Sequence, residues 1–364
     1  MDFHVFEFLQ EGMTDSECIK ECIETANQHN KNKRVIFNRK DWLIDEAILV
    51  SSDMEIVIDG CTIKQNDYVF DNIFRGVNLK VNDDDPYGKP EYVTSLKNIT
   101  IKGYNNAIIA GCDRSKTGYH PVLNKEMEMV GDNWGWRTIL ICISNCENIE
   151  ITGLNIYQTK CWAISLDFCS YCSIHDIHIE SDVKNGDGID LRIGCHHVRI
   201  WNITGSTSDD TVACTALFHS RREYPHKNYL YPLAPMGAIF NGSKSDMDIH
   251  DVLISDIRTG GLCHGVICLA ADGLQVYNID IKNIEDVKEG RRTATVMLYT
   301  GYGENYSDND LHDIRISGIH SRFSKYAVSI NTKVNNVTVS DTVQENKEGN
   351  LYEFANPEGI TVIE

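Results

Sequence analysis

The 364-residue sequence lacks long apolar runs and is poor in basic side chains. No stretch approaches the ~18 consecutive apolar residues of a membrane-spanning helix. Only 34 Lys and Arg residues stand against 53 Asp and Glu residues, which gives a formal net charge of −19. Because nucleic-acid phosphates require a basic surface, we expect neither a nucleic acid nor a membrane as partner.

The sequence also lacks a secretory signal and a complete cysteine metal motif. The first residues, MDFHVFEFLQEG, contain neither a basic segment nor a long apolar segment. Among 13 cysteines the only CxxC pair is Cys169 and Cys172, and no second pair completes a zinc site. We therefore expect reduced, mostly buried thiols in a cytoplasmic protein. A secreted protein whose signal peptide has been removed is the alternative.

Only one segment has the pattern of an amphipathic helix. Thr14 to Glu17 form a capping box, and apolar residues follow at helical spacing from Cys18 to Ala26. We expect this helix over residues 14–30, where it would cap the open end of a β-rich core.

The rest of the chain repeats an Asn or Asp, then Ile or Val, then alternating apolar residues. Several intervals between copies are near 25 residues: 148 to 173, 173 to 198, 249 to 274 and 311 to 336. A repeat of this length indicates a solenoid, and about three short strands without a helix make one coil of a parallel β-helix. We predict an all-β fold, a parallel β-helix, as one domain over residues 1–364. A propeller repeats at about 40–50 residues and a sandwich has no steady period, so both are less favoured.

The repeat fails in residues 218–247, which are rich in aromatic, basic and Pro residues. The interval from Val198 to Ile249 is 51 residues, about two periods (249 − 198). The segment is therefore either a long loop on one coil or an irregular extra coil. Its three prolines favour the loop, and long loops on a solenoid shape the binding face.

Three carboxylates are spaced about one coil apart. Asp187 lies in an Asn-Gly-Asp-Gly turn, and Asp209 and Asp210 follow 22 and 23 residues later (209 − 187 and 210 − 187). Equivalent residues of adjacent coils lie about 4.8 Å apart, so we expect one acidic patch. Clustered carboxylates raise the pKa of at least one member, which produces the acid and base pair of a glycoside hydrolase. Each motif alone is an ordinary polar turn, so the prediction depends on the coil register.

The neighbouring His196 and His197 raise the question of a metal site. Adjacent residues on a strand point to opposite faces, so we expect that the two cannot ligate one ion. We predict no metal and no cofactor.

The motifs NGDGIDL, SDDTVA and GGLCHG together resemble the polygalacturonase-type, pectin-degrading glycoside hydrolase family. Members of this family carry Asn-Thr-Asp-Gly, Asp-Asp, Gly-His-Gly and Arg-x-Lys in that order on a right-handed parallel β-helix. The resemblance runs from about Met13 to Thr338. It implies an inverting hydrolase for a pectin-like or other complex glycan. We expect exo-action on oligosaccharides, because residues 218–247 would block one end of the groove.

The resemblance also implies roles for individual residues. Asp209 is the expected general acid, and Asp187 and Asp210 would activate the water on the opposite face. His264 would support the protonation state of the acid. Asn185, in the first motif, is expected to bind substrate.

The sequence departs from the family pattern at three places. Gly186 replaces Thr, which is a small change, and 55 residues separate Asp209 from His264 (264 − 209). The Arg-x-Lys motif, which binds the substrate carboxylate in the family, is missing, and its place falls near Met297 to Tyr299. Either the sugar at the cleavage site is neutral, or another residue binds it. The candidate substrate-binding residues are Arg192, Arg221, Arg222, Arg291, Arg292, Tyr299, Tyr302, Trp134 and Trp136.

Two other functions fit the same sequence. A polysaccharide lyase on this fold would use the three aspartates to hold calcium. A carbohydrate-binding solenoid would bind glycans without turnover.

Overall fold

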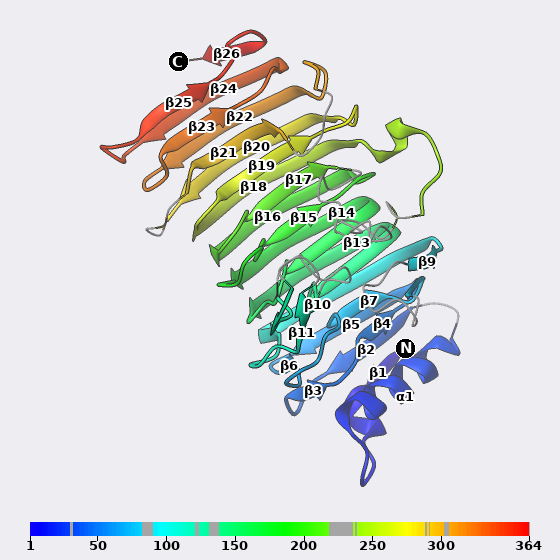
Figure 1. Cartoon of the computed structure of the whole chain (residues 1–364). Coiled ribbons are helices and arrows are strands. Elements are labelled where there is room, and N and C mark those ends of the chain that lie inside the picture. The colour runs from blue at the N-terminus through cyan, green and yellow to red at the C-terminus, as the bar shows by residue number, and fades with distance from the viewer. Residues whose placement is uncertain are drawn as a thin grey trace.

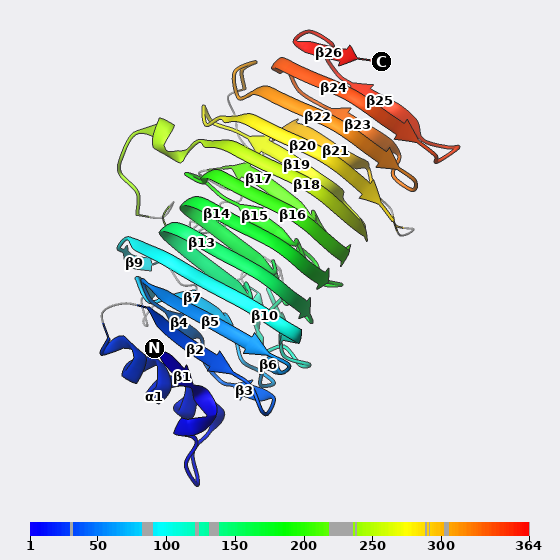
Figure 2. The same cartoon turned by 180° about the vertical axis from the view of Figure 1, so that it is seen from behind.

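The strands of the protein stack in coils along one axis, with the N-terminus at one end and the C-terminus at the other (Figure 1). A computed structural model describes residues 1–29, 32–81, 90–120, 124–130, 138–217, 236, 239–287, 290, 292–301 and 306–363. Within this part, 22 strands join in one sheet whose pairings are parallel. The reverse view shows the same order of coils from behind (Figure 2). The predicted all-β fold, a parallel β-helix, is confirmed.

The N-terminal coils contain β1 (Asp2–His4), β2 (Lys33–Phe37), β3 (Trp42–Ile44), β4 (Ile48–Val50), β5 (Met54–Asp59), β6 (Thr62–Gln65), β7 (Phe74–Gly76) and β10 (Leu96–Ala110). The middle coils contain β13 (Ile141–Tyr157), β14 (Ile164–Glu180), β15 (Ile189–Leu191), β16 (His196–Thr207), β17 (Val212–Ala216), β18 (Ile249–Gly261) and β19 (His264–Ala270). The C-terminal coils contain β20 (Val276–Asp286), β21 (Ala294–Thr300), β22 (Leu311–Ser321), β23 (Tyr326–Ile330), β24 (Asn335–Gln344), β25 (Asn350–Phe354) and β26 (Ile360–Ile363). Outside the stack are the antiparallel pairs β8 (Leu79–Val81) with β9 (Pro90–Val93), and β11 (Thr117–His120) with β12 (Lys125–Glu128).

The helix α1 (Asp15–Asn27) lies across the N-terminal end of the stack (Figure 1). Thr14 caps it: the Thr14 hydroxyl accepts from Glu17 N at 3.2 Å, and Thr14 N donates to Glu17 Oε2 at 2.8 Å. The apolar face of the helix is buried and contacts β2, β3 and β4, so the helix closes the open end of the core. It ends at Asn27, slightly before the expected end. Two short 3₁₀ helices, Val5–Phe8 and Lys244–Met247, are the other helical segments among the described residues.

The Asn or Asp of the repeated motif marks a corner of each coil. Six of these residues have φ between 51° and 62°, the left-handed region that Asn and Asp adopt more readily than most residues: Asn98, Asn148, Asp251, Asn278, Asp313 and Asn336. Their side chains bond from coil to coil, as Asn98 Nδ2 does to Asp53 Oδ1 at 2.6 Å and Asn148 Nδ2 to Asn98 Oδ1 at 3.0 Å. Inward Ile, Val, Leu and Cys side chains then form one continuous core.

The long interval of the repeat adds no coil to the stack. The strand β16 pairs directly with β18, with Val198 opposite Val252, and β17 pairs directly with β19, with Val212 opposite Val266. In both pairs the two partners come from opposite ends of the long interval. The chain between Leu217 and Met247 is therefore an excursion from the stack, of which residues 218–235 and 237–238 lie outside the described part.

None of the thirteen cysteines, all of which lie in the described ranges, forms a disulfide, and all are buried except the partly exposed Cys263. No helix in the described ranges combines the length and the apolar character needed to span a membrane.

Candidate active site

Three of the predicted site residues, Asp187, Asp210 and His264, occupy equivalent positions on three successive coils. Each lies two residues before a paired core position of the short strands β15, β17 and β19. Backbone bonds extend the pairing to them, because Gly188 N donates to Asp210 O at 2.8 Å and Thr211 N donates to His264 O at 2.9 Å. The direct pairing of β17 with β19 thus brings His264 beside Asp210, although the excursion separates them in the chain.

His264 forms two hydrogen bonds with one carboxylate oxygen of Asp210. Its Nδ1 lies 2.6 Å and its backbone N 3.1 Å from Asp210 Oδ1. Both side chains are 14% exposed, so solvent weakens this contact little. The resemblance implied that His264 forms a hydrogen bond near the acid Asp209, and its hydrogen bonds go to the neighbouring Asp210.

Asp187 is a buried carboxyl group, 6% exposed. Its Oδ1 accepts no hydrogen bond from any residue that the structure describes. Burial raises the pKa of Asp187 well above its usual value, and the neighbouring Asp190, Asp209 and Asp210 raise it further. Asp187 therefore favours its protonated form.

Asp209 lies between Asp210 and the thiol of Cys263, and the candidate ligand atoms of the three side chains are within 4.8 Å of one another. Burial, followed by the charge of Asp210, raises the pKa of Asp209, while a hydrogen bond with Cys263 and the charge of His264 act against this rise. Burial and the same two carboxylates raise the pKa of Cys263, which keeps this thiol a hydrogen-bond donor. Cys263 was not among the predicted site residues, although its place directly before His264 was the available signal.

The NGDG turn packs closely against the next coil. A Cβ atom on Gly186 would lie 2.0 Å from Ser181 Oγ and 2.4 Å from Ser208 Oγ. The same atom would lie 2.8 Å from the backbone oxygen of Val183, so the Thr of the family pattern would require this backbone to shift as well as both hydroxyls. The replacement of Thr by Gly186 is therefore not the small change that the sequence suggests. Asn185, in the same turn, has φ 54° and is partly exposed.

Arg192 is buried on the same sheet face. It is 3% exposed, its guanidinium lies 4.9 Å from the ring centre of Trp162, and its Nη1 lies 3.8 Å from Asp190 Oδ1. Trp162 precedes Ala163, whose N donates to Asp187 O at 2.9 Å, so this tryptophan occupies the position next to Asp187 on the preceding coil. Trp162 was not among the predicted site residues, and its motif, CWAISL, contains no charged group.

Arg292 is also buried, and it lies behind the acidic group. Its Nη2 donates to Thr211 Oγ1 at 2.8 Å and to Gly260 O at 2.7 Å, and its Nη1 donates to Thr259 O at 3.1 Å. Burial lowers the pKa of Arg292 to about 10. These hydrogen bonds hold the guanidinium inside the protein. The hypothesis that Arg292 is an accessible cation for a sugar carboxylate is therefore wrong. The other candidates Arg221, Arg222, Arg291, Trp134, Trp136 and Tyr302 lie outside the described residues.

Apolar side chains occupy the expected place of the family cations. On β21, Met297 lies opposite Ile267 and Tyr299 lies opposite Leu269. Met297, Ile267 and Leu269 belong to a buried apolar cluster with Ala213, against which Tyr299 packs. Among the described residues this cluster contains no cation.

One family model matches part of the chain. Residues 132–220, which include Asp187, Asp209 and Asp210, match the family model described as glycosyl hydrolases family 28. No curated protein matches the chain.

Solved structures share the fold at low sequence identity. The family 28 exopolygalacturonase of Yersinia enterocolitica has a TM-score of 0.51 at 13% identity, covering 100% of this chain and 77% of that one. The hyperthermoactive exopolygalacturonase of Thermotoga maritima has a TM-score of 0.55 at 15% identity, with coverages of 100% and 90%. A tailspike protein mutant of E. coli bacteriophage HK620 has a TM-score of 0.65 at 14% identity, and the chain spans 61% of its length.

These neighbours confirm the right-handed parallel β-helix. The family match, over the segment that carries the three aspartates, confirms the predicted resemblance to polygalacturonase-type enzymes and the identification of the chain as a glycoside hydrolase.

Proposed function

We propose that the protein cleaves a glycosidic bond of a pectin-like or other complex glycan with inversion at the anomeric carbon. The observation that carries the proposal is the coil register that places Asp187, Asp210 and His264 in one line, with Asp209 beside them. Two of these carboxyl groups have raised pKa values, so the group can hold the proton that the acid role requires.

In this proposal Asp209 donates its proton to the leaving-group oxygen. Asp210 accepts two hydrogen bonds on Oδ1 from His264, so Oδ2 is the oxygen that receives a proton from the attacking water. Asp187, which favours its protonated form, orients the same water from the preceding coil by donating a hydrogen bond to it. Inversion usually requires carboxyl groups about 6.5–9.5 Å apart, which leaves room for this water. Oxygens of Asp209 and Asp210 lie within 4.8 Å of each other, so the proposal of inversion rests on the family resemblance and not on this spacing.

We propose a neutral sugar at the cleavage site. Arg192 and Arg292 are each 3% exposed, and the expected cation positions hold Met297 and Tyr299. Among Arg192, Arg292, Met297 and Tyr299, no exposed cation is present to bind a carboxylate on the sugar.

We propose exo-action because described residues of the excursion contact the coil that precedes the site. Met236 N donates to Asp167 Oδ2 at 2.8 Å, and the ring of Phe240 lies 4.6 Å from that of Phe168. Both contacts are on β14, which belongs to the coil that precedes β15 and Asp187, so Met236 and Phe240 lie on the N-terminal side of the site.

The test is a digestion of neutral and pectic oligosaccharides by the wild-type protein, with the released anomer read by NMR. Inverted product, one terminal unit at a time and from neutral termini, is the expected result. A retained anomer rules out inversion, random internal cuts rule out exo-action, and an ultraviolet-absorbing unsaturated product identifies a lyase.

The thiol of Cys263 beside Asp209 and Asp210 already disfavours a calcium site, because calcium takes oxygen ligands.

A further inference from the structure

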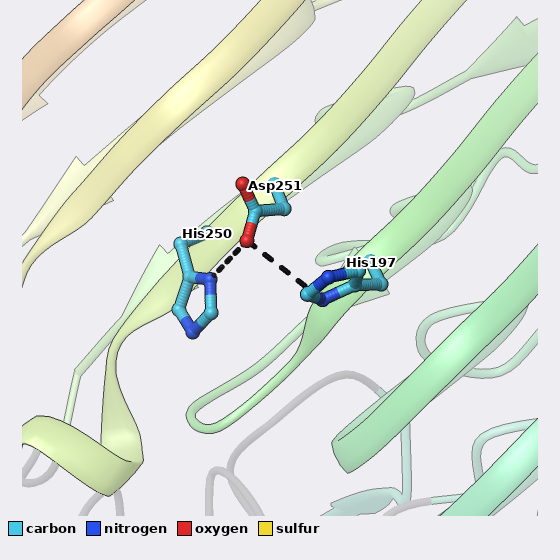
Figure 3. A group of neighbouring side chains, drawn as sticks. All are labelled: His197, His250 and Asp251. Atoms are coloured by element: carbon cyan, nitrogen blue, oxygen red, sulfur yellow. Dashed lines mark hydrogen bonds and ion pairs between the residues drawn. The ribbon is translucent and has the colours of Figure 1, made fainter.

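Two histidines and an aspartate from adjacent coils meet at one corner of the β-helix. His197 lies at the start of β16, and His250 and Asp251 lie at the start of β18. Figure 3 shows the two imidazoles on either side of the Asp251 carboxylate. The candidate ligand atoms of the three side chains lie within 4.8 Å of one another.

This corner is distinct from the active site. The residues Asp187, Asp210 and His264 begin the short strands of three coils, whereas His197, His250 and Asp251 begin the long strands that follow. The mechanism proposed above uses none of these three residues.

The backbone conformation of His197 creates the site. Its φ is 54°, in the left-handed region, so the alternation of side chains along a regular strand does not apply at this residue. The Nδ1 atoms of His196 and His197 lie 2.9 Å apart. The expectation that these two histidines point to opposite faces is therefore wrong.

His197 occupies the corner position that Asn or Asp occupies in other coils. Asn148, Asn278 and Asn336 are equivalent residues, and their amides bond within the corner ladder. At His197 an imidazole replaces the amide and faces the carboxylate of the next coil, Asp251, with Nδ1 at 3.7 Å from Oδ2.

Asp251 is oriented for a ligand. Asn278 Nδ2 donates to its Oδ1, while its Oδ2 faces both imidazoles, at 2.8 Å from His250 Nδ1 and 3.7 Å from His197 Nδ1. His250 is fixed in turn by stacking on His196, with ring centres 5.0 Å apart and an interplanar angle of 3°. The carboxylate and one imidazole are thus held in place before any ion binds.

We propose that His197, His250 and Asp251 bind a divalent transition-metal ion, Zn²⁺ or a similar first-row ion. Two imidazole nitrogens and one carboxylate oxygen are ligands that zinc takes at about 2.0–2.2 Å, whereas calcium and magnesium prefer oxygen alone. The ion replaces the proton between His250 Nδ1 and Asp251 Oδ2, and this ring keeps its proton on Nε2.

Water completes the coordination. The side chains of His197, His250 and Asp251 are 45%, 24% and 34% exposed. His197 and Asp251 line a surface hollow of about 460 Å³ together with Arg199 and Asn278. An ion therefore has an entry path and space for one or more water ligands.

The position of the site gives the ion a structural role. His197 and His250 lie on adjacent coils, but they stand on either side of the excursion in the chain. An ion bound to both histidines would link the residues before the excursion to the residues after it. Because the ligands meet only in the folded chain, binding raises the stability of the folded state.

The experiment measures binding of ZnCl₂ to the metal-free full-length protein by calorimetry, and the melting temperature with and without the ion. We expect one ion per chain and a rise in melting temperature for the wild type. The variant His197→Asn, which introduces the usual corner residue, should fold normally and lose at least tenfold in affinity.

The matched control is His312→Ala. His312 Nδ1 lies 2.7 Å from Asp313 Oδ2, the same local pair as His250 and Asp251, but the preceding corner residue is Asn278 rather than a histidine. This control and Cys263→Ser, which removes the thiol beside Asp209, should bind zinc as the wild type does. The proposal is overturned if the wild type binds no ion, if His197→Asn binds as tightly as the wild type, or if Cys263→Ser abolishes binding.

Discussion

Asp210 and His264 are joined through a single carboxylate oxygen, with His264 Nδ1 at 2.6 Å and His264 N at 3.1 Å from Asp210 Oδ1. The pair connects the two ends of the longest interval in the repeat. It also fixes the orientation of the carboxylate that we assign to the attacking water.

The variant His264→Ala tests this orientation. Loss of a hydrogen bond to a charged group costs about 1.5–3 kcal/mol, so kcat should fall about 10- to 100-fold with little change in KM. Steady-state kinetics on the substrate found in the digestion measure both constants. A matched substitution, His312→Ala, should leave both unchanged, and a rise in KM alone for His264→Ala would speak against the role.

The variant Asp209→Asn tests the general acid. An amide cannot protonate the leaving group, so turnover should fall by at least about 10²- to 10⁴-fold. Binding of the oligosaccharide, measured by calorimetry, should stay near the wild-type value. The control is Asp182→Asn, an exposed aspartate shortly before Asp187, which should be fully active. If Asp209→Asn retains most of its activity, the acid is another residue.

The buried Asp167 predicts a dependence of stability on pH. Burial raises the pKa of Asp167 from 3.8 to about 7, although hydrogen bonds from Ser144 and Met236 N act against the rise. The folded state therefore holds this proton more tightly than the unfolded state does. Its contribution to stability is present below the unfolded pKa and is lost as pH rises from about 4 to about 7.

The measurement for Asp167 is urea unfolding of wild type and Asp167→Asn at pH 4, 5, 6 and 7. The variant should remove a decline of at most about 4 kcal/mol across this range, at about 1.4 kcal/mol per pKa unit. Equal slopes for the two proteins would show that the carboxyl group does not titrate in this window.

The close packing at Gly186 predicts that the family residue is harmful here. Gly186→Thr should lower the free energy of unfolding by about 1–3 kcal/mol, because its Cβ overlaps Ser181 Oγ and Ser208 Oγ. Removing both hydroxyls in the triple variant Ser181→Ala, Ser208→Ala, Gly186→Thr should recover part of the loss, and urea unfolding measures it. A Gly186→Thr protein as stable as the wild type would mean that the turn relaxes freely.

The sequence was sufficient to predict the coils and the acidic group. The period of the repeat follows from left-handed corner residues such as Asn148 and Asn336, and so it is visible as Asn or Asp before Ile or Val. The spacing of Asp187 and Asp210 is close to one such period, which is why their equivalent positions on adjacent coils were predictable.

Other features depend on pairings that no local pattern encodes. Whether His264 reaches Asp210 depends on β17 pairing directly with β19 across the excursion, and either outcome fits the sequence. The burial of Arg292 depends on Thr211 and Thr259, which belong to two other coils. The geometry of His197 depends on its positive φ, which is uncommon for a non-glycine residue and hidden in a strand-like sequence.

The excursion begins after β17 and ends before β18, so it is inserted between Asp210 and His264 without touching the register that joins them. Its length and composition can change while the coils on both sides stay paired. The segment after Leu217 and before Met247 can therefore vary, in evolution or by design, separately from the paired coils that carry Asp210 and His264.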